Sequence, residues 1–419
     1  MGLIFSEGGP HAVIDRERMA AALKEVFDTL GARSRVLAIP PDFTRANSMA
    51  GPLTSIAFDY YGAALTDIMP ALGTHDPMPE WQWERMFAGV PRSLMRVHNW
   101  RSDVLDIGEV PADFVGRATE GVYRQPWPVQ LNRMIVEGGH DLILSIGQVL
   151  PHEVAGMANH SKNLFVGTGG AAAINPSHFI GAAYGMERMM GIADTPLRRI
   201  FNYAFENYCR DLPIVFIQTV IARDETGANV CRGLYIGDGI ECFERAAALA
   251  AEVNVTQLGR RAQKIVAYLD PEEFHSTWLG NKAIYRSRMA IADGGELIVL
   301  APAVETFGED REIDQLIRKY GYRTTPKVMD FVEHNDDLRG NLAAAAHLIH
   351  GSTEGRFTVT YCPGKLGRAE IEAVGYKFGD LDEMLAIYDI ASLKEGWNND
   401  KYGEEFYYIE NPALGLWKE

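Results

Sequence analysis

Short apolar runs that end in polar or glycine-rich turns recur along the chain. Runs of this length, rich in Val, Ile and Leu, are typical of strands buried on both faces. Six of them are expected to be strands: Arg35–Pro40, Asp141–Ser145, Ile214–Gln218, Lys264–Tyr268, Leu297–Leu300 and Phe357–Tyr361. Helical spacing of apolar residues occurs at Pro128–Glu137, Ile240–Val253, Lys282–Ala292, Asp310–Tyr320, Asn341–Ile349 and Leu381–Tyr388. This alternation predicts an α/β fold with mostly parallel sheets.

The length of the chain predicts more than one domain. One hydrophobic core stops growing at about 250–300 residues, and this chain has 419. The polar segment Thr256–Gln263 follows a helical pattern and precedes a strand, so we expect a domain boundary near residue 262. Residues 1–262 would form an N-terminal catalytic domain and residues 263–394 a C-terminal α/β domain, with the tail at about 395–419 returning to the first. An active-site cleft is expected between them.

Charge and cysteine content narrow the partners and the compartment. The chain has 40 basic and 56 acidic residues, and this net charge of −16 disfavours binding to nucleic acid or to anionic membranes. No window approaches the roughly 18 apolar residues that span a bilayer. Four cysteines without a C-x-x-C pair argue against a disulfide framework or structural zinc, and favour a reducing cytoplasm. An anionic ligand would therefore depend on individual Arg and Lys residues.

Polar residues with catalytic potential follow three predicted strands. Asp42–Arg45 follows the first strand, and Gly73–His75 follows an apolar run at Ala64–Leu72. The segment Pro151–Gly170, with His178 after it, follows Asp141–Ser145. Ligands of open α/β sheets bind at the carboxyl ends of strands, so we expect these loops to converge. Taken singly, each residue has a simpler role in a turn, a surface or a salt bridge. The residues alone predict an α/β enzyme with a histidine-rich site.

Four motifs in one order resemble those of the nickel-dependent lactate racemases: Asp42-Phe-Thr-Arg45, Gly73-Thr-His75, Pro151-His152 with Lys162, and His178. The resemblance extends over most of the chain and includes Asn281–Arg288. It implies a racemase or epimerase that inverts C2 of a 2-hydroxy acid by reversible hydride transfer. The cofactor it implies is the nickel-pincer nucleotide, a pyridinium-3,5-bisthiocarboxylic acid mononucleotide that carries nickel.

The resemblance also implies roles for the residues that would bind the cofactor and for those that would move protons. Lys162 would tether the cofactor covalently, and His178 would complete the coordination of nickel, for which neutral imidazole is a good donor. His75 and His152 would be the paired acid and base. Imidazole suits this task because its ordinary pKa of about 6.5 lets it take and return a proton near neutrality.

Further contacts follow from the same resemblance. Asp42 and Arg45 would lie beside the cofactor, with Arg45 holding a carboxylate or the nucleotide. Gly169 and Gly170, with the helix expected after them, would receive the cofactor phosphate through backbone amides. Tyr285 would contact the substrate from the second domain.

Two departures from the family pattern bear on the site. Asn159-His160-Ser161 stands where the family commonly has Ser-Gly-Gly, so the backbone is expected to follow another path, with His160 as an extra substrate or cofactor contact or a hydrogen-bonding loop residue. Met289 occupies the place of a family lysine that holds the substrate carboxylate. Arg286, Arg288 or Lys282 could take over this role, and an arginine would suit a larger or more oxygenated acid. The substrate stays open among lactate, malate-like diacids and sugar acids such as aldonates.

Two rival functions remain at the level of sequence. One is a zinc- or iron-dependent hydrolase or lyase that uses His152, His160 and His178 as ligands. The other is a noncatalytic binder of hydroxy acids. The expected partners are a small 2-hydroxy acid and the proteins that mature the cofactor, without nucleic acid or membrane, and the oligomeric state is left open.

Overall fold

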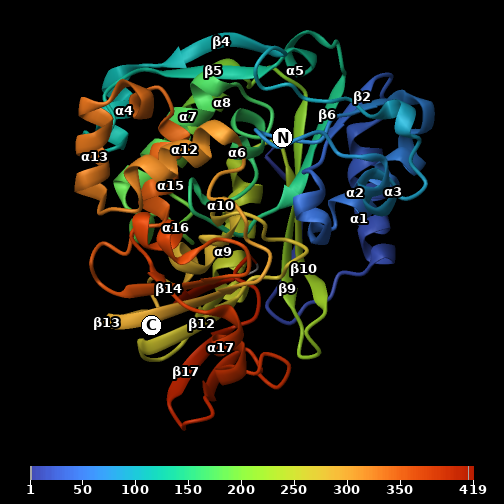
Figure 1. Ribbon diagram of the computed structural model, residues 1–419. Coiled ribbons are helices and arrows are strands. Elements are labelled where there is room, and N and C mark those ends of the chain that lie inside the picture. The colour runs from blue at the N-terminus through green and yellow to red at the C-terminus, as the bar shows by residue number, and fades with distance from the viewer. Residues whose placement is uncertain (1, 414) are drawn as a thin grey trace. The chain divides into compact units, whose positions relative to one another are not determined.

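Figure 1 shows the computed structural model, which describes residues 2–413 and 415–419. The chain forms two compact units, one of Met1–Ser177 with Met189–Asn254 and the other of His178–Arg188 with Val255–Glu419. The main division falls after Asn254 and not near residue 262, because β11 (Val255–Gln257) already pairs with β18 (Leu416–Lys418) in the second unit. The tail from residue 395 is also part of the second unit.

The sheet of the first unit has the strand order β1, β10, β9, β6, β2, β3. Its strands are β1 (Leu3–Gly8), β10 (Asn229–Gly237), β9 (Ile214–Arg223), β6 (Leu142–Gln148), β2 (Val36–Ile39) and β3 (Leu65–Ile68). The last four run parallel, whereas β1 and β10 form antiparallel pairs. The carboxyl ends of β9, β6, β2 and β3 therefore share one edge of the sheet, which is where α/β proteins bind ligands.

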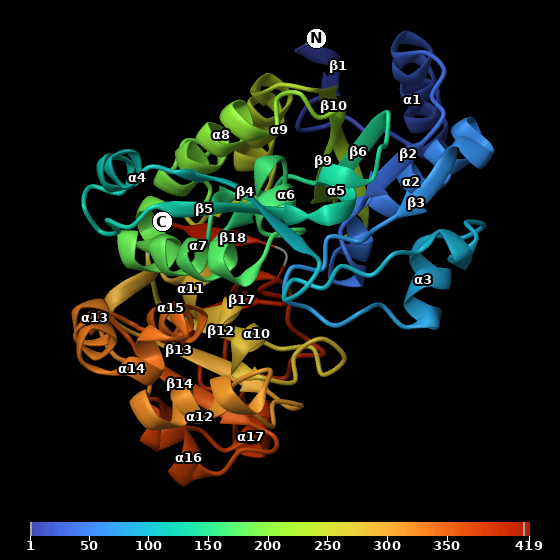
Figure 2. The same cartoon turned by 90° about the horizontal axis from the view of Figure 1, so that it is seen from above.

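Two layers of helices cover this sheet, and Figure 2 shows one on each side. Ala38, Leu144 and Ile217 belong to the core on the side of α1 (Arg16–Leu30), α2 (Ala50–Tyr61) and α3 (Glu80–Met86). Ser145 and Phe216 point to the opposite side, because neighbouring residues of a strand face opposite ways. That side carries α6 (Ser161–Phe165), α8 (Pro196–Tyr208) and α9 (Ile240–Val253).

Local sequence signals explain where these helices begin and which face they bury. The Asp15 carboxylate accepts a hydrogen bond from the Arg18 N–H and so caps α1, and Thr195 caps α8 in the same way. In α9 the buried residues Cys242, Phe243, Ala246 and Ala250 recur at the spacing of one helix face. The remaining helices of the first half of the chain are α4 (Ala112–Ala118), α5 (Arg133–Glu137) and α7 (Ala171–Tyr184).

The sheet of the second unit has the order β15, β14, β13, β12, β17, β16. Its strands are β15 (Lys377–Phe378), β14 (Thr358–Pro363), β13 (Ile291–Ala301), β12 (Ala262–Tyr268), β17 (Glu405–Ile409) and β16 (Gly396–Asn399), of which only β16 pairs antiparallel. Its helices are α10 (Thr277–Gly280), α11 (Lys282–Ser287), α12 (Arg311–Tyr320), α13 (Thr325–His334), α14 (Asp336–Arg339), α15 (Leu342–His350), α16 (Arg368–Ala373) and α17 (Leu381–Ile387). Both sheets confirm the predicted α/β class with parallel-rich sheets.

Two predicted helices are wrong in part. Within Pro128–Glu137 the structure has strand β5 (Trp127–Asn132), paired with β4 (Val104–Val110), before the short helix α5. Trp127, Val129 and Leu131 are buried in alternation, which is the period of a strand. The predicted helix Lys282–Ala292 ends at Ser287, and β13 begins at Ile291.

The structure adds two observations on chemistry and membranes. All four cysteines are buried and free of disulfide bonds. Among the described residues, no helix combines the length and the apolar character that a bilayer crossing requires.

Candidate active site

Three loops of the first unit carry the predicted residues to the carboxyl edge of its sheet. The 3-10 helix η1 (Phe43–Ser48) starts directly after β2, and the Asp42 carboxylate caps it by accepting from the Thr44 N–H. The loop after β3 turns at Gly73, whose φ of +59° favours glycine, and the Gly73 N–H donates to the Gly167 carbonyl at 2.8 Å. The hairpin of β7 (Pro151–His152) and β8 (Gly156–Met157) follows β6 and leads into α6.

Asp42 and His75 form a hydrogen-bonded pair across two of these loops. The Asp42 Oδ2 lies 2.6 Å from the His75 Nδ1, and the Asp42 side chain is 8% exposed whereas that of His75 is 45% exposed. Burial would raise the pKa of Asp42, but the hydrogen bond and charge of His75, with Thr44 and Arg45, hold this pKa below its ordinary value. An ionised carboxylate only accepts hydrogen bonds, so Nδ1 of His75 carries a proton, and in the neutral form of the ring Nε2 holds the lone pair.

His152 has the opposite tautomer. Its Nδ1 accepts a hydrogen bond from the Val154 N–H at 3.1 Å, and a backbone N–H can only donate. The proton of the neutral ring therefore sits on Nε2. The Glu153 Oε2 lies 4.0 Å from the same Nδ1, and this carboxylate next to His152 was not singled out by the sequence.

Lys162 lies in the first turn of α6, where a strand-end loop was expected, and it is half-buried. Burial first, and then the positive charge of Arg45, lower the pKa of its amine to about 8, against the opposing charges of Glu153 and Asp42. The same Arg45 acts on Asp42. The loops of the first unit are joined by the hydrogen bonds from Asp42 to His75 and from Gly73 to Gly167.

His160 occupies a closed aromatic environment. Its ring is 2% exposed and stacks on Phe216 with centroids 3.8 Å apart, and its Nε2 lies 3.3 Å from the Gly239 carbonyl. Burial first, and then the charge of Arg198, lower the pKa of His160 to about 3, so the ring is neutral. Of the two roles expected for His160, these contacts favour the hydrogen-bonding loop residue over a substrate contact.

The backbone at Asn159 and His160 is left-handed, with φ of +67° and +56°. Glycine adopts this conformation without strain, whereas other residues pay for it with steric contact of Cβ. The path is therefore one that glycine would accept, and the larger residues here are held in it by their surroundings.

Gly169 and Gly170 have a packing reason that does not involve a phosphate. A Cβ at Gly169 would lie 1.9 Å from the Phe165 carbonyl oxygen, and one at Gly170 would lie 2.5 Å from the Gln130 side-chain oxygen. The Gly169 carbonyl accepts from the buried His98 Nε2 at 3.0 Å. Helix α7 begins directly after them, as expected, and their role toward a phosphate stays a prediction.

The second unit holds the other predicted residues. His178 is in the segment His178–Arg188 of that unit, and Tyr285 is 3% exposed in α11. Arg286 is 2% exposed, and its Nη1 donates to the carbonyls of Ala413 and Gly415, so one nitrogen of this guanidinium fixes the chain near its C-terminus. The substrate roles of these residues stay predictions.

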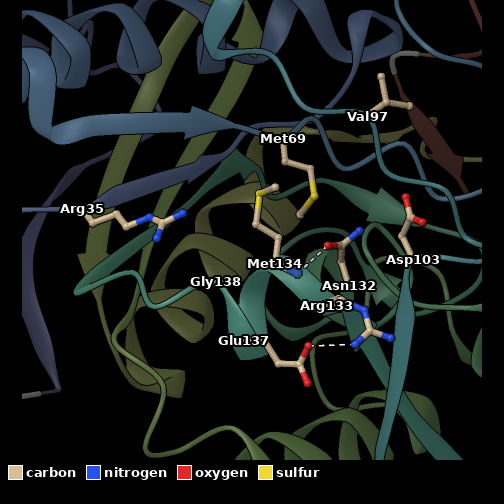
Figure 3. A pocket seen from close by; sticks show the side chains of 9 residues that line it. All are labelled: Arg35, Met69, Val97, Asp103, Asn132, Arg133, Met134, Glu137 and Gly138. Atoms are coloured by element: carbon tan, nitrogen blue, oxygen red, sulfur yellow. Dashed lines mark hydrogen bonds and ion pairs between the residues drawn. The ribbon is translucent and has the colours of Figure 1, made fainter.

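A cavity of about 400 Å³ in the first unit, shown in Figure 3, is separate from this chemistry. Its lining residues are Arg35, Met69, Val97, Asp103, Asn132, Arg133, Met134, Glu137 and Gly138, none of which is a predicted site residue. Arg133 forms an ion pair with Glu137 at 2.8 Å, and the two arginines are matched by two acidic residues in the lining. This balance gives the cavity no preference for an anion.

The described residues can be compared with the kind of side-chain cluster that binds zinc in enzymes. Among residues 2–413 and 415–419, no group of three His, Cys, Asp or Glu side chains is arranged to hold a metal ion. The enclosed ring of His160 also makes it a poor third ligand beside His152 and His178.

Residues 12–189 match the sequence model of the lactate racemase N-terminal domain, a range that contains Asp42, His75, His152, Lys162 and His178. A comparison with curated proteins finds no significant match. Among solved structures, a protein from Thermotoga maritima aligns over 98% of this chain and 99% of its own, with 23% identity and a TM-score of 0.82. The lactate racemase apoprotein from Thermoanaerobacterium thermosaccharolyticum aligns over 97% and 94%, with 15% identity and a TM-score of 0.71.

The protein is thus a two-unit α/β protein with the fold of a lactate racemase. Its candidate site has histidines and one lysine at the carboxyl ends of the strands. Residues 12–189 are similar in sequence to the lactate racemase N-terminal domain, which supports a place for the chain in the lactate racemase family.

Proposed function

We propose that this protein is a racemase or epimerase that inverts C2 of a 2-hydroxy acid with a nickel-pincer nucleotide bound at Lys162. The observation that carries the proposal is the Asp42–His75 pair at 2.6 Å, in the same loop cluster as an amine whose pKa is lowered to about 8. A base oriented by a carboxylate, next to an amine that is neutral in part at cellular pH, is what this reaction requires of the chain.

The two histidines suit opposite proton tasks. Nε2 of His75 holds a lone pair and takes the hydroxyl proton, while Asp42 stabilises the imidazolium that forms. Nε2 of His152 carries a proton, because its Nδ1 accepts from Val154, and so it donates to the oxygen of a 2-oxo acid. A base and an acid in one resting state allow the proton to leave on one side and return on the other.

The residues fit the cofactor by the chemistry of their donors. Lys162 has an amine that burial keeps partly neutral, as bond formation to a thiocarboxylate requires. Arg45 offers a guanidinium to a phosphate or a carboxylate, and His178 offers an imidazole nitrogen to nickel. When bound, the nickel-pincer nucleotide would supply the acceptor and donor of the hydride at C2. Proteins that mature this cofactor are the proposed partners, in a reducing cytoplasm.

The proposed substrate is an anionic 2-hydroxy acid. The overall charge of −16 repels anions, so a local cation such as Arg45 would hold the carboxylate. Tyr285 and Arg286 stay predicted substrate contacts. Met289 replaces the family lysine, which favours an acid other than lactate, such as a diacid or a sugar acid.

The test is a screen of cofactor-loaded protein against 2-hydroxy acids of graded size, with both C2 epimers followed by chiral chromatography. Nickel content and the mass of the peptide that contains Lys162 are measured on the same sample. We expect a mass increase at Lys162 and epimer interconversion for one class of acid. A loaded, nickel-containing protein that converts none of them would refute the activity and leave a hydroxy-acid binder.

Three variants assign the roles within that test. His75→Ala and His152→Ala should each reduce turnover by about 100-fold or more with nickel content intact, since acid–base groups contribute about 10²–10⁴-fold. His178→Ala should lower nickel retention. Unchanged nickel in the His178 variant would remove this residue from the ligand role.

A further inference from the structure

Arg198 in α8 is a buried cation that binds the loop before Lys162. Its side chain is 1% exposed. Nη2 donates to the Met157 carbonyl at 2.6 Å, and Nη1 donates to the Asn159 carbonyl at 3.1 Å and to the Ser161 hydroxyl at 3.0 Å. One guanidinium thus holds three positions of the five-residue stretch that ends immediately before Lys162.

The loop that Arg198 holds is strained. Asn159 and His160 are consecutive residues with positive φ, and such a conformation costs about 1–2 kcal/mol for a residue with a Cβ. Strained backbone persists only where neighbouring contacts over-determine it. Here those contacts are the hydrogen bonds of Arg198 and the stacking of His160 on Phe216. Removing the guanidinium would therefore release the loop.

Arg198 has no ion-pair partner among the described carboxylates, and its charge rests on an aromatic face. Its guanidinium carbon lies 4.0 Å from the centroid of Phe243, and its remaining polar contacts are the carbonyls and the hydroxyl of the loop. Burial lowers the pKa of Arg198 to about 9, which keeps it charged at neutral pH. A buried charge without a counter-ion is costly, so a structural role alone would be served better by an apolar side chain.

We infer that Arg198 is a positioning residue for Lys162: it fixes the loop that presents the amine, and its buried positive charge acts on that amine. The inference deepens the proposed function, because it concerns the residue that would bind the cofactor. The charges that act on the Lys162 amine are Arg45 and Arg198 on one side and Glu153 and Asp42 on the other. Arg198 is the one that also determines where the amine stands.

The test uses the full chain without cofactor and measures how Lys162 reacts. The protein is treated with limiting acetyl N-hydroxysuccinimide ester between pH 6 and pH 10, and acetylation of Lys162 is quantified by mass spectrometry against the exposed Lys377 as internal reference. Amide hydrogen exchange of residues 157–162 is followed in parallel. The variants are Arg198→Met, Arg198→Lys and, as matched control, Arg199→Met, whose exposed side chain pairs with Asp194 at 2.7 Å.

For the wild type we expect a half-maximal rate near pH 8. Arg198→Met should move this midpoint upward, because one positive charge that disfavours the protonated amine is removed, and should accelerate exchange in residues 157–162. Arg198→Lys should keep the midpoint and accelerate exchange, because it retains the charge but not three hydrogen bonds. Arg199→Met should match the wild type in both measurements.

Unchanged midpoint and exchange in Arg198→Met would overturn the inference. If that variant does not fold, Arg198→Lys and Ser161→Ala decide: each should accelerate exchange of the loop by roughly 2- to 10-fold, and wild-type exchange in both would refute the positioning role. No outcome depends on racemase activity, so failure of the proposed function and failure of this inference are separable.

Discussion

The two imidazole rings of the site carry their protons on different nitrogen atoms, and each tautomer is set by one hydrogen bond. Asp42 fixes the proton of His75 on Nδ1, and the Val154 N–H fixes that of His152 on Nε2. If the Nδ1 atoms of both rings had the same kind of partner, the two Nε2 atoms would both carry a proton or would both hold a lone pair. The difference in their partners gives the site a direction before any substrate is bound.

The Asp42–His75 pair makes a prediction on stability against pH. Because the folded pKa of Asp42 is lowered, its contribution is complete above the ordinary value of 3.8 and is lost as pH falls through the lowered pKa. Asp42→Asn should cost about 1.5–3 kcal/mol at pH 7, the range for hydrogen bonds to charged groups. Urea unfolding at pH 7 and below pH 3.8 measures the difference, which should shrink in acid. The exposed Asp59→Asn is the control, and an equal cost at every pH would contradict the prediction.

His160 gives a second prediction, which separates a packing role from a substrate contact. Its ring lies between Phe216 and Phe243, with centroids at 3.8 Å and 5.6 Å. His160→Ala should destabilise the first unit by about 2–4 kcal/mol through the cavity it leaves. His160→Phe keeps an aromatic ring there and should preserve the KM of the loaded enzyme. A large increase of KM in the phenylalanine variant, with stability unchanged, would return His160 to the substrate.

Among the elements, the turn at Gly73 connects the His75 loop to the start of the α6–α7 region. A Cβ at Gly73 would lie 3.3 Å from the Val166 carbonyl oxygen, in addition to the strain of φ +59°. Gly73→Ala should destabilise by about 1–2 kcal/mol and should also reduce turnover, because His75 shifts against Lys162.

The matched control for that variant is Gly89→Ala. Gly89 has φ of +83° and nothing within 4 Å of an added Cβ, so it carries the backbone strain without a contact near the site. Both variants are compared by urea unfolding and by turnover of the loaded protein. Equal turnover in the two variants would show that the Gly73 turn does not position His75.

The sequence predicted an element well where its apolar residues have the spacing of one type of element throughout. It did so less well where the spacing of a strand and that of a helix follow each other closely. The six predicted strands are present because each is buried on both faces. The stretch Pro128–Glu137 was misassigned because it mixes the two-residue alternation of β5 with one helical turn of α5. The three loops that carry the predicted residues follow β2, β3 and β6, and their role in ligand binding stays a prediction from the rule that ligands bind at strand ends.

Other features could not be predicted, because they depend on which face of a helix turns inward. Arg198 and Arg199 are neighbours of the same type, yet one is 1% exposed and the other pairs with Asp194 at the surface. No local pattern distinguishes them. Glu153 was within reach of sequence reasoning, because it adjoins His152 in a loop already recognised as polar.

For the molecule as a complete chain, the segment His178–Arg188 is the informative part. It interrupts the first unit in sequence but belongs to the second, where Glu187 pairs with the buried Arg288 at 2.6 Å and approaches Arg356 at 3.9 Å. The predicted nickel ligand His178 and the predicted tether Lys162 therefore belong to different compact units.

The last prediction tests whether this segment is energetically part of the second unit. Arg288 is 1% exposed and Glu187 is 39% exposed, so Glu187→Gln leaves a buried guanidinium without its carboxylate and should destabilise by about 1–3 kcal/mol, less than for a fully buried pair. Hydrogen exchange should accelerate in β12 and β13, and not in β2 or β6. The control Glu206→Gln breaks an exposed pair with Arg210 in the first unit and should cost only about 0.3–0.5 kcal/mol. Acceleration confined to β2 and β6 would show that the segment stabilises the first unit instead.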